Sequence, residues 1–161
     1  MSYDKKILQD LIEGKLEWTK LKEIISAPKD ADRFFKVLEI LQEKVQFKEK
    51  IILPLTEHLY IVKKENNYIV KCDCGYEFDN YKKNWKHQAN IYLRDTEKKL
   101  QEIYPPFMHS QADWIEIREF YCPGCFALLE TEALPPGYPV ILDFVPDLEG
   151  FYKETLGCEL P

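Results

Sequence analysis

The chain has 161 residues and a formal net charge of −6, and 45% of its residues are hydrophobic and 31% charged. This composition is typical of a folded globular protein and excludes disorder over most of the chain, and the length suits one compact domain with room for a small helical lobe. The apolar runs are far shorter than the roughly 20 residues that a membrane-spanning helix needs, and the first residues lack the pattern of a secretory signal. We therefore expect a cytoplasmic protein without a membrane span.

Charge is distributed unevenly along the chain. Residues 1–71 contain 14 Lys and Arg against 12 Asp and Glu, whereas residues 72–161 contain 8 against 16. The acidic second half would repel a phosphate backbone, so nucleic acid is not an expected partner. Aromatic residues make up 14% of the chain, and because such residues are favoured at protein interfaces, they indicate a subunit of a larger assembly.

The first 48 residues carry hydrophobic side chains at helical spacing. This pattern predicts short helices over about residues 4–13 and 16–25, the second ending before Pro28 because a proline disfavours helical conformation in the residue that precedes it. A third helix is expected from Asp30, as its N-cap, to about Lys44.

After residue 50 the pattern changes to extended segments rich in Ile, Val, Leu and Tyr. One further helix is expected over residues 96–104, ended by Pro105-Pro106, and residues 133–147 hold four prolines that suit an extended arm before a short helix at 148–156. The predicted strands cover residues 50–55, 59–63, 68–72, 89–94, 114–121 and 126–132.

Four of the five cysteines form two close pairs, Cys72 with Cys74 and Cys122 with Cys125, each at the end of a predicted strand. Two short turns of this kind supply four thiolates in a tetrahedron, which is the arrangement that Zn²⁺ prefers. We therefore predict a metal site at these four residues, with an iron centre as the remaining alternative to zinc. A shell of four cysteines leaves no open position for water, so the ion would be structural rather than catalytic.

Other chemistry has less support in the sequence. His87 lies between the cysteine pairs and could replace a cysteine, but a lone histidine is more often a packed or surface residue. A redox role for Cys122 and Cys125 is disfavoured because no helix follows to lower the thiol pKa, and Cys158 has no partner in the sequence and receives no role. Phosphate-binding and nucleophile motifs are absent, so we expect no catalytic residue in the isolated chain.

These patterns predict an α+β fold in three parts. Residues 1–48 form a helical region, residues 49–133 a zinc-ribbon-like antiparallel β lobe with two cysteine turns and one helix, and residues 134–161 an extended proline-rich arm with a short helix.

Short sequence blocks follow one another in a recognisable order over nearly the whole chain. Besides the two cysteine motifs they include Lys50–Leu55, Asn84-Trp85-Lys86, Arg94-Asp95-Thr96, Ile117-Arg118-Glu119 and Glu149–Tyr152. Their order resembles the small gamma-type subunit of the acetone carboxylase family, which includes related carboxylases for aromatic ketones such as acetophenone.

The resemblance implies a cytoplasmic hetero-oligomer in which two large hydantoinase-like subunits, of alpha and beta type, use ATP to join a ketone and bicarbonate into a β-keto acid. The small subunit, present in more than one copy, would hold structural zinc at Cys72, Cys74, Cys122 and Cys125. ATP and any further divalent metal are expected in the partner subunits only. A free-standing zinc-ribbon adaptor and a small zinc enzyme are the alternatives, and the sequence does not select the ketone.

Aromatic residues near the two ends of the chain suggest where the large subunits bind. We expect the N-terminal helical region and the C-terminal arm to provide contact residues, because one small monomer has difficulty in burying so many aromatic side chains. The expected contacts are Phe34, Phe35, Phe47, Tyr138, Phe144, Phe151 and Tyr152.

Overall fold

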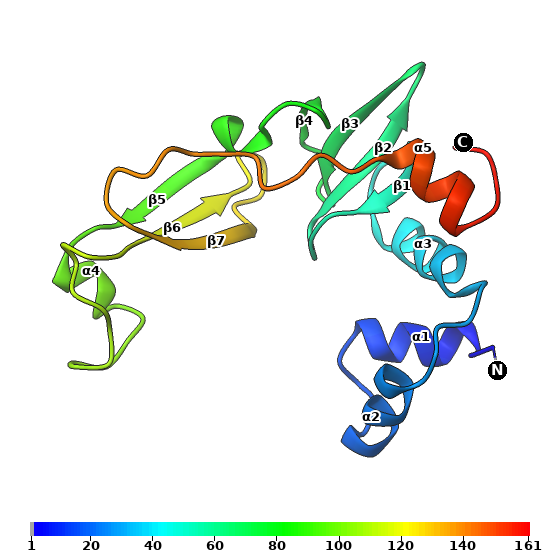
Figure 1. The fold of residues 1–161 in the computed structure, drawn as a ribbon, viewed down its shortest axis with the longest axis horizontal. Helices are drawn as coiled ribbons and strands as arrows, with labels where there is room; N and C mark the ends of the chain where they lie inside the picture. Colours follow the sequence, from blue (N-terminus) through cyan, green and yellow to red (C-terminus); the bar gives the residue numbers. More distant parts are fainter. Residues whose placement is uncertain (1) are drawn as a thin grey trace.

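The computed structural model describes residues 2–161 and has two antiparallel β-sheets preceded by three helices (Figure 1). The opening helices are α1 (Lys5–Ile12), α2 (Trp18–Ser26) and α3 (Arg33–Lys44). In Figure 1 the first sheet lies beside these helices, and the second sheet lies on the side of the first that is away from them. The expected α+β class is confirmed, whereas the expected division at residues 48 and 133 stays a prediction. Among residues 2–161, no helix is long and apolar enough to cross a membrane.

The first sheet has the strand order β1-β2-β3-β4, with all neighbours antiparallel. Its strands are β1 (Lys50–Pro54), β2 (Leu59–Lys64), β3 (Asn67–Cys72) and β4 (Glu77–Asn80). The sequence did not predict β4, because its four residues include Glu, Asp and Asn, which have low strand propensity. The cysteine turn after β3 brings this segment alongside β3, so β4 forms through its partner strand.

The second sheet has the order β5-β6-β7 and is also antiparallel. Its strands are β5 (Asn90–Arg94), β6 (Glu116–Tyr121) and β7 (Leu128–Leu134), and a 3₁₀ turn, η1 (Trp85–Gln88), precedes β5. The helix predicted over residues 96–104 is shorter than expected, since α4 covers only Glu97–Leu100. Residues 101–115 form turns and loop, and Trp114, which was expected in a strand, is 71% exposed in this loop.

Helical segments from both ends of the chain cover the first sheet. Leu38 of α3 packs on Ile51 and Val62, whereas Leu148 and Tyr152, from the C-terminal segments α5 (Leu148–Gly150) and η2 (Phe151–Thr155), pack on Ile52 and Ile61. Neighbouring strand residues point to opposite faces, so Ile51 and Ile52 contact different helices. The hydroxyl of Tyr152 donates to the carbonyl oxygen of Ile52 at 2.8 Å.

This core corrects part of the expected set of contact residues. Phe34, Phe47 and Phe151 pack against the core clusters, and Tyr152 is 1% exposed. The other three expected contact residues, Phe35, Tyr138 and Phe144, remain 38%, 42% and 60% exposed. The sequence overestimated the exposed aromatic surface because it did not show that the C-terminal segment folds back onto the first sheet.

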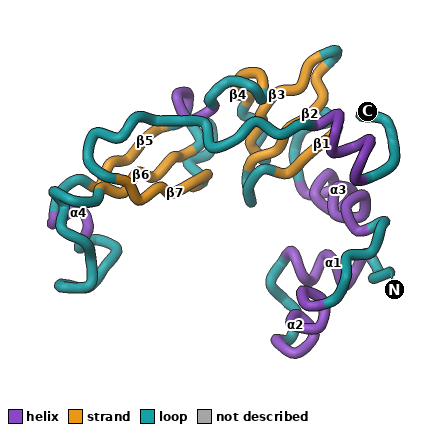
Figure 2. Tube along the Cα trace, in the orientation of Figure 1, coloured by secondary structure: helices purple, strands orange, loops and turns teal. Residues whose placement is uncertain are grey.

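The arm between β7 and α5 has no regular structure from residue 135 to 147, and it runs from the second sheet back to the first (Figure 2). Its backbone carbonyls accept hydrogen bonds from the rest of the chain: that of Val140 from Asn84 Nδ2 at 3.1 Å and that of Tyr138 from Arg118 Nη2. The arm is therefore fastened to its own chain along its length.

The expected N-cap of α3 is also corrected. The helix has Asp32, not Asp30, at its N-cap position. Asp30 instead accepts hydrogen bonds from Arg33 Nε at 2.6 Å and from the Tyr3 backbone N–H at 3.3 Å. Both acidic residues precede the helix, and the sequence alone does not show which one the chain places at its start.

Candidate metal centre

The four paired cysteines converge where the two sheets meet. Cys72 ends β3 and Cys74 lies in the turn to β4, whereas Cys122 follows β6 and Cys125 lies in the turn to β7. Their four Sγ atoms all lie within 4.8 Å of one another, with Cys72 and Cys125 3.8 Å apart and Cys74 and Cys122 3.7 Å apart. A tetrahedron with Zn–S bonds of about 2.3 Å places its sulfur atoms about 3.8 Å apart. The donor set and its spacing therefore fit a four-thiolate zinc site.

Glycines shape both cysteine turns. Gly75 has φ +95°, a conformation that other residues rarely adopt, and its N–H donates to the carbonyl of Cys72 at 2.9 Å. Gly124 lies where the two turns meet, because a Cβ built on it would lie 3.3 Å from Cys74 Sγ and 3.1 Å from Tyr76 Cβ. The Gly124 N–H also donates to Cys122 Sγ at 3.3 Å, as expected of a turn that supports a thiolate.

The surroundings of Cys72 and Cys74 disfavour thiolates that have no cation. Cys72 and Cys122 are fully buried, and burial raises the pKa of the thiols of Cys72 and Cys74. Because a metal ligand must be a thiolate, a bound cation would offset the cost of ionising these groups.

A hydrophobic core spans both sheets around the cysteines. The ring of Trp85 makes edge-to-face contacts with Phe78 of β4 and with Phe120 of β6, at centroid distances of 5.8 and 6.0 Å. Cys72 and Cys122 belong to the same buried cluster. The cysteines therefore lie at the seam that joins the two halves of the β structure.

Histidines and the fifth cysteine lie apart from this cluster. His87 is exposed and adjoins Asn84, which fits the surface residue that the sequence favoured over a metal ligand, and Cys158 is exposed and outside the cluster. His58 Nδ1 lies 2.7 Å from Asp73 Oδ2. Since Asp73 lies between Cys72 and Cys74, His58 contacts the first cysteine turn without belonging to the sulfur cluster.

Known proteins similar to this chain identify its family. The family model described as acetone carboxylase gamma subunit matches residues 45–156. The acetone carboxylase gamma subunit of Xanthobacter autotrophicus is 45% identical over 163 aligned positions, which cover 100% of this chain and 97% of the relative. This chain belongs to the acetone carboxylase gamma subunit family. The acetophenone carboxylase beta subunit of Aromatoleum aromaticum is 30% identical over 116 positions, covering 68% of this chain and 79% of the relative.

The match to the acetone carboxylase gamma subunit family confirms the resemblance read from the sequence blocks. The matched segment contains all four clustered cysteines and both sheets, and it leaves out helices α1, α2 and α3.

A second polar cluster in this family member was not predicted. The side chain of Lys86 is fully buried, and its Nζ lies 2.7 Å from Glu130, 2.5 Å from Glu132 and 2.6 Å from Asp143. Burial by itself lowers the pKa of Lys86, but the hydrogen bonds to the three carboxylates outweigh it and hold the pKa above its ordinary value. Glu130 and Glu132 are two residues apart on β7 and share one face, which was the signal in the sequence. We call Lys86 and these three carboxylates the Lys86 cluster.

Proposed function

We propose that this chain is the non-catalytic, zinc-holding small subunit of a cytoplasmic ATP-dependent ketone carboxylase. The convergence of four cysteine sulfurs at zinc–thiolate spacing carries the structural part of the proposal. The family membership and the relatives, which are named as subunits of carboxylases, support the assembly part.

The zinc would stabilise the junction of the two sheets. Each sheet has its own hydrogen-bonded ladder, and each contributes two of the four cysteines through its turns. Four thiolates close the coordination shell, so the ion would have no position for a reacting water or substrate. The ketone and bicarbonate would therefore be activated with ATP on the larger alpha-type and beta-type subunits, with this chain present in more than one copy.

Acetone is the proposed ketone, with acetoacetate as the product. The relative named for acetone carboxylase aligns with the whole chain at 45% identity, whereas the relative named for acetophenone carboxylase aligns with 68% of the chain at 30% identity. An aromatic ketone such as acetophenone is the second candidate.

Metal analysis of the complex co-purified with its larger subunits tests the proposal. We expect about one zinc per copy of this chain, loss of that zinc in Cys72→Ser, and full zinc in the matched control Cys158→Ser, whose thiol is exposed and outside the cluster. ATP-dependent consumption of ketone should require the larger subunits.

Four results would overturn parts of the proposal. A stoichiometric metal other than zinc, or an active and stable complex without metal, would contradict the zinc assignment. Turnover by the isolated chain that disappears on mutating its own residues would indicate a small zinc enzyme, and a chain that never joins the carboxylase subunits would indicate a free-standing adaptor.

A further inference from the structure

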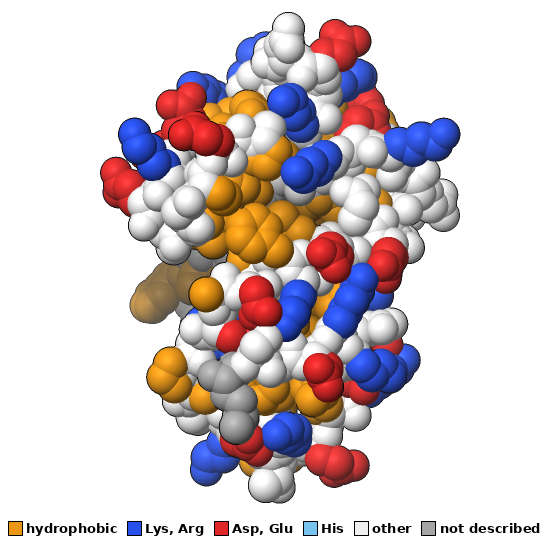
Figure 3. All heavy atoms as spheres, turned by 90° about the vertical axis from the view of Figure 1, so that its right-hand side faces the viewer, with side chains coloured by type: hydrophobic (Ala, Val, Ile, Leu, Met, Phe, Trp, Pro, Cys, Tyr) orange, Lys and Arg blue, Asp and Glu red, His pale blue; other side chains and the backbone are white. Residues whose placement is uncertain are grey.

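Exposed apolar side chains gather on two distant surfaces of the molecule. One is a groove of 470 Å³ lined by Phe34 and Val37 of α3 and by Phe151 of the C-terminal segment. Hydrophobic side chains gather near the middle of the face shown in Figure 3. The other surface lies near the opposite end of the molecule in Figure 1, in the segment between α4 and β6. We call residues 103–114 of this segment the apolar loop.

The apolar loop exposes large side chains that are mostly not buried against the rest of the chain. Phe107 is 100% exposed, Met108 73% and Trp114 71%. Phe107 also has φ +66°, a backbone conformation that is energetically costly for a bulky residue. Because its ring is fully exposed, no burial of this side chain within the monomer compensates for that cost.

The exposed area is large enough to form a substantial part of an interface. Since a large aromatic side chain presents about 150–250 Å², Phe107 and Trp114 together expose about 250–430 Å², and the exposed part of Met108 adds to this area. The largest apolar patch on a typical monomer is about 300–600 Å² and is often functional, and a standard interface buries about 800 Å² per partner. Ile103 and Tyr104, at the start of the same loop, are 43% and 42% exposed.

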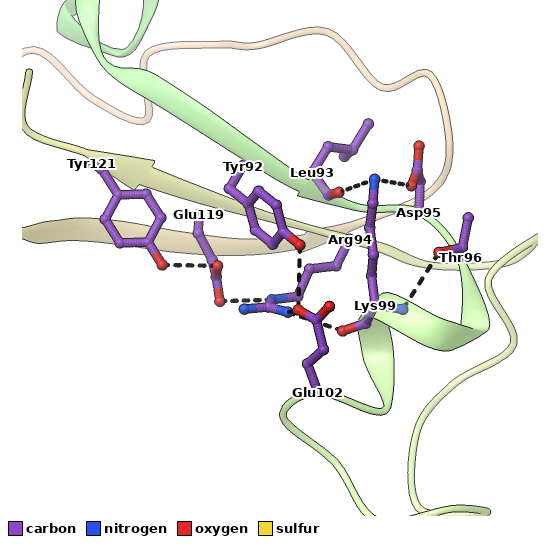
Figure 4. A network of polar contacts seen from close by, with 9 residues as sticks. All are labelled: Tyr92, Leu93, Arg94, Asp95, Thr96, Lys99, Glu102, Glu119 and Tyr121. Carbon is purple, nitrogen blue, oxygen red and sulfur yellow. Dashed lines mark hydrogen bonds and ion pairs between the residues drawn. The ribbon is translucent and has the colours of Figure 1, made fainter. Parts of the chain in front are cut away.

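A network of polar contacts holds the base of the apolar loop rigidly on the second sheet (Figure 4). Arg94 of β5 donates from Nε to Glu119 of β6 at 2.9 Å, and from Nη1 to Glu102 at 2.6 Å and to the Lys99 carbonyl at 2.9 Å. Lys99 Nζ in turn donates to the Leu93 carbonyl at 2.9 Å. Because α4 and Glu102, directly before the loop, are already held in place, a partner would pay less ordering entropy on binding.

The two exposed surfaces differ in their relation to the family model. The matched segment, residues 45–156, contains the whole apolar loop, whereas the groove is lined partly from inside that segment, by Phe151, and partly from outside it, by α3. A surface that serves a role shared by carboxylase subunits is expected in the shared segment. Glu97 and Asp113 line one pocket with Phe107 and have no ion-pair partner among residues 2–161, so the complementary surface would be apolar with basic groups beside it.

We propose that the apolar loop docks this chain onto a larger subunit of the carboxylase, with Phe107 and Trp114 filling an apolar pocket on that subunit. This inference rests on the proposed function and adds to it the location of one contact surface. Large aromatic side chains in desolvated pockets provide most of the binding energy at many interfaces, so single substitutions should have measurable effects.

Co-purification with affinity-tagged larger subunits tests the inference, with two tryptophans as a matched pair. Trp114 and Trp18 are 71% and 69% exposed, but Trp18 is on α2, outside the matched segment. We expect Trp114→Ala and Phe107→Ala to weaken association with the larger subunits at least tenfold, and Trp18→Ala to leave it unchanged. Unchanged zinc content and circular dichroism of each variant would show that its fold is intact.

The outcomes separate this inference from the proposed function. If the wild-type chain does not associate with the larger subunits, the proposed function fails and this inference with it. If the wild-type chain associates and folded Trp114→Ala and Phe107→Ala variants associate equally well, only the docking loop is wrong. Self-association of the isolated chain that Trp114→Ala abolishes, without any change in the complex, would instead assign the loop to a second copy and overturn the inference.

Discussion

Replacing Lys86 by methionine tests how strongly the Lys86 cluster stabilises the fold. Methionine has nearly the length of lysine, so the change removes the ammonium group and leaves the apolar stem in place. Glu130 and Glu132, whose side chains are 24% and 10% exposed, would then lose their shared cation. Asp143 is 49% exposed and can turn to water, so its loss of the ion pair should matter least.

The expected loss follows from the burial of these groups. Removing one partner of a buried ion pair costs about 3–5 kcal/mol, because a buried charge is left without compensation. Since both glutamates retain some exposure, the lower end of about 3 kcal/mol is expected. For a protein of this length, that loss corresponds to a fall in melting temperature of about 6–12 °C.

The dependence on pH identifies the charges as the cause. Burial already raises the pKa of Glu130, and loss of the ammonium group would raise it further. As the pH falls, the folded variant then binds protons before its unfolded chain does, so the free-energy difference between variant and wild type should shrink as the pH falls toward the ordinary glutamate pKa of about 4.3.

Equilibrium denaturant unfolding at several pH values measures both effects. Lys83→Met is the matched control, because Lys83 is 67% exposed and pairs only with Asp79, and it should leave the unfolding midpoint unchanged. A Lys86→Met variant within about 1 kcal/mol of wild type at pH 7.5 would refute the reasoning. A deficit of the same size at pH 5 and pH 8 would assign the loss to packing and not to charge.

Three further predictions concern the metal, the helical region and the C-terminal segment. Removal of the metal by a chelator should unfold the junction of the sheets and zinc should restore it, as followed by circular dichroism, because metal binding energy is also folding energy; unchanged spectra would contradict this. Burial raises the pKa of Asp30, but the hydrogen bonds from Arg33 and from backbone N–H groups outweigh it and lower the pKa to about 2, so the stabilisation is present above about pH 4 and is lost toward pH 2. The melting temperature of Asp30→Asn should therefore lie below that of wild type at pH 7 and approach it near pH 2, and a constant difference would argue against the pairing. Tyr152→Ala should cost about 3–5 kcal/mol in denaturant unfolding, because it empties a buried site, whereas the same change at Phe144, which is 60% exposed, should cost little; equal effects would contradict the observed packing.

Local chemistry explains which features could be predicted from the sequence. Helices α1 and α2 and the hairpin of β2 and β3 lie within a residue or two of their predicted positions, because periodicity and turn residues act over short distances. Proline and glycine end several helices and strands for the same reason, because each restricts or frees the backbone only at its own position and the adjacent one. The four cysteines could be assigned to one site because each pair lies in a short turn at a strand end.

Features that depend on distant partners could not be predicted in this way. Strand β4 has weak propensity and exists through its pairing with β3. Lys86 looks like a surface lysine in the sequence, and its burial results from carboxylates that lie 44 to 57 residues away. Helix α4 ends at Leu100, where the exposed side chains of Ile103 and Tyr104 provide no packing to continue it and Pro105 disfavours a helical Tyr104.

The sequence by itself determined the family, the α+β class and the set of cysteines, since each depends on residue identity and spacing within short segments. Only the tertiary structure decided that the strands form two sheets, that the C-terminal segment returns to cover the first sheet, and that Tyr152 is a core residue while Trp114 is exposed. The reason is physical: an aromatic side chain has the same affinity for a core as for a partner, and only the path of the folded chain determines which of the two it can reach.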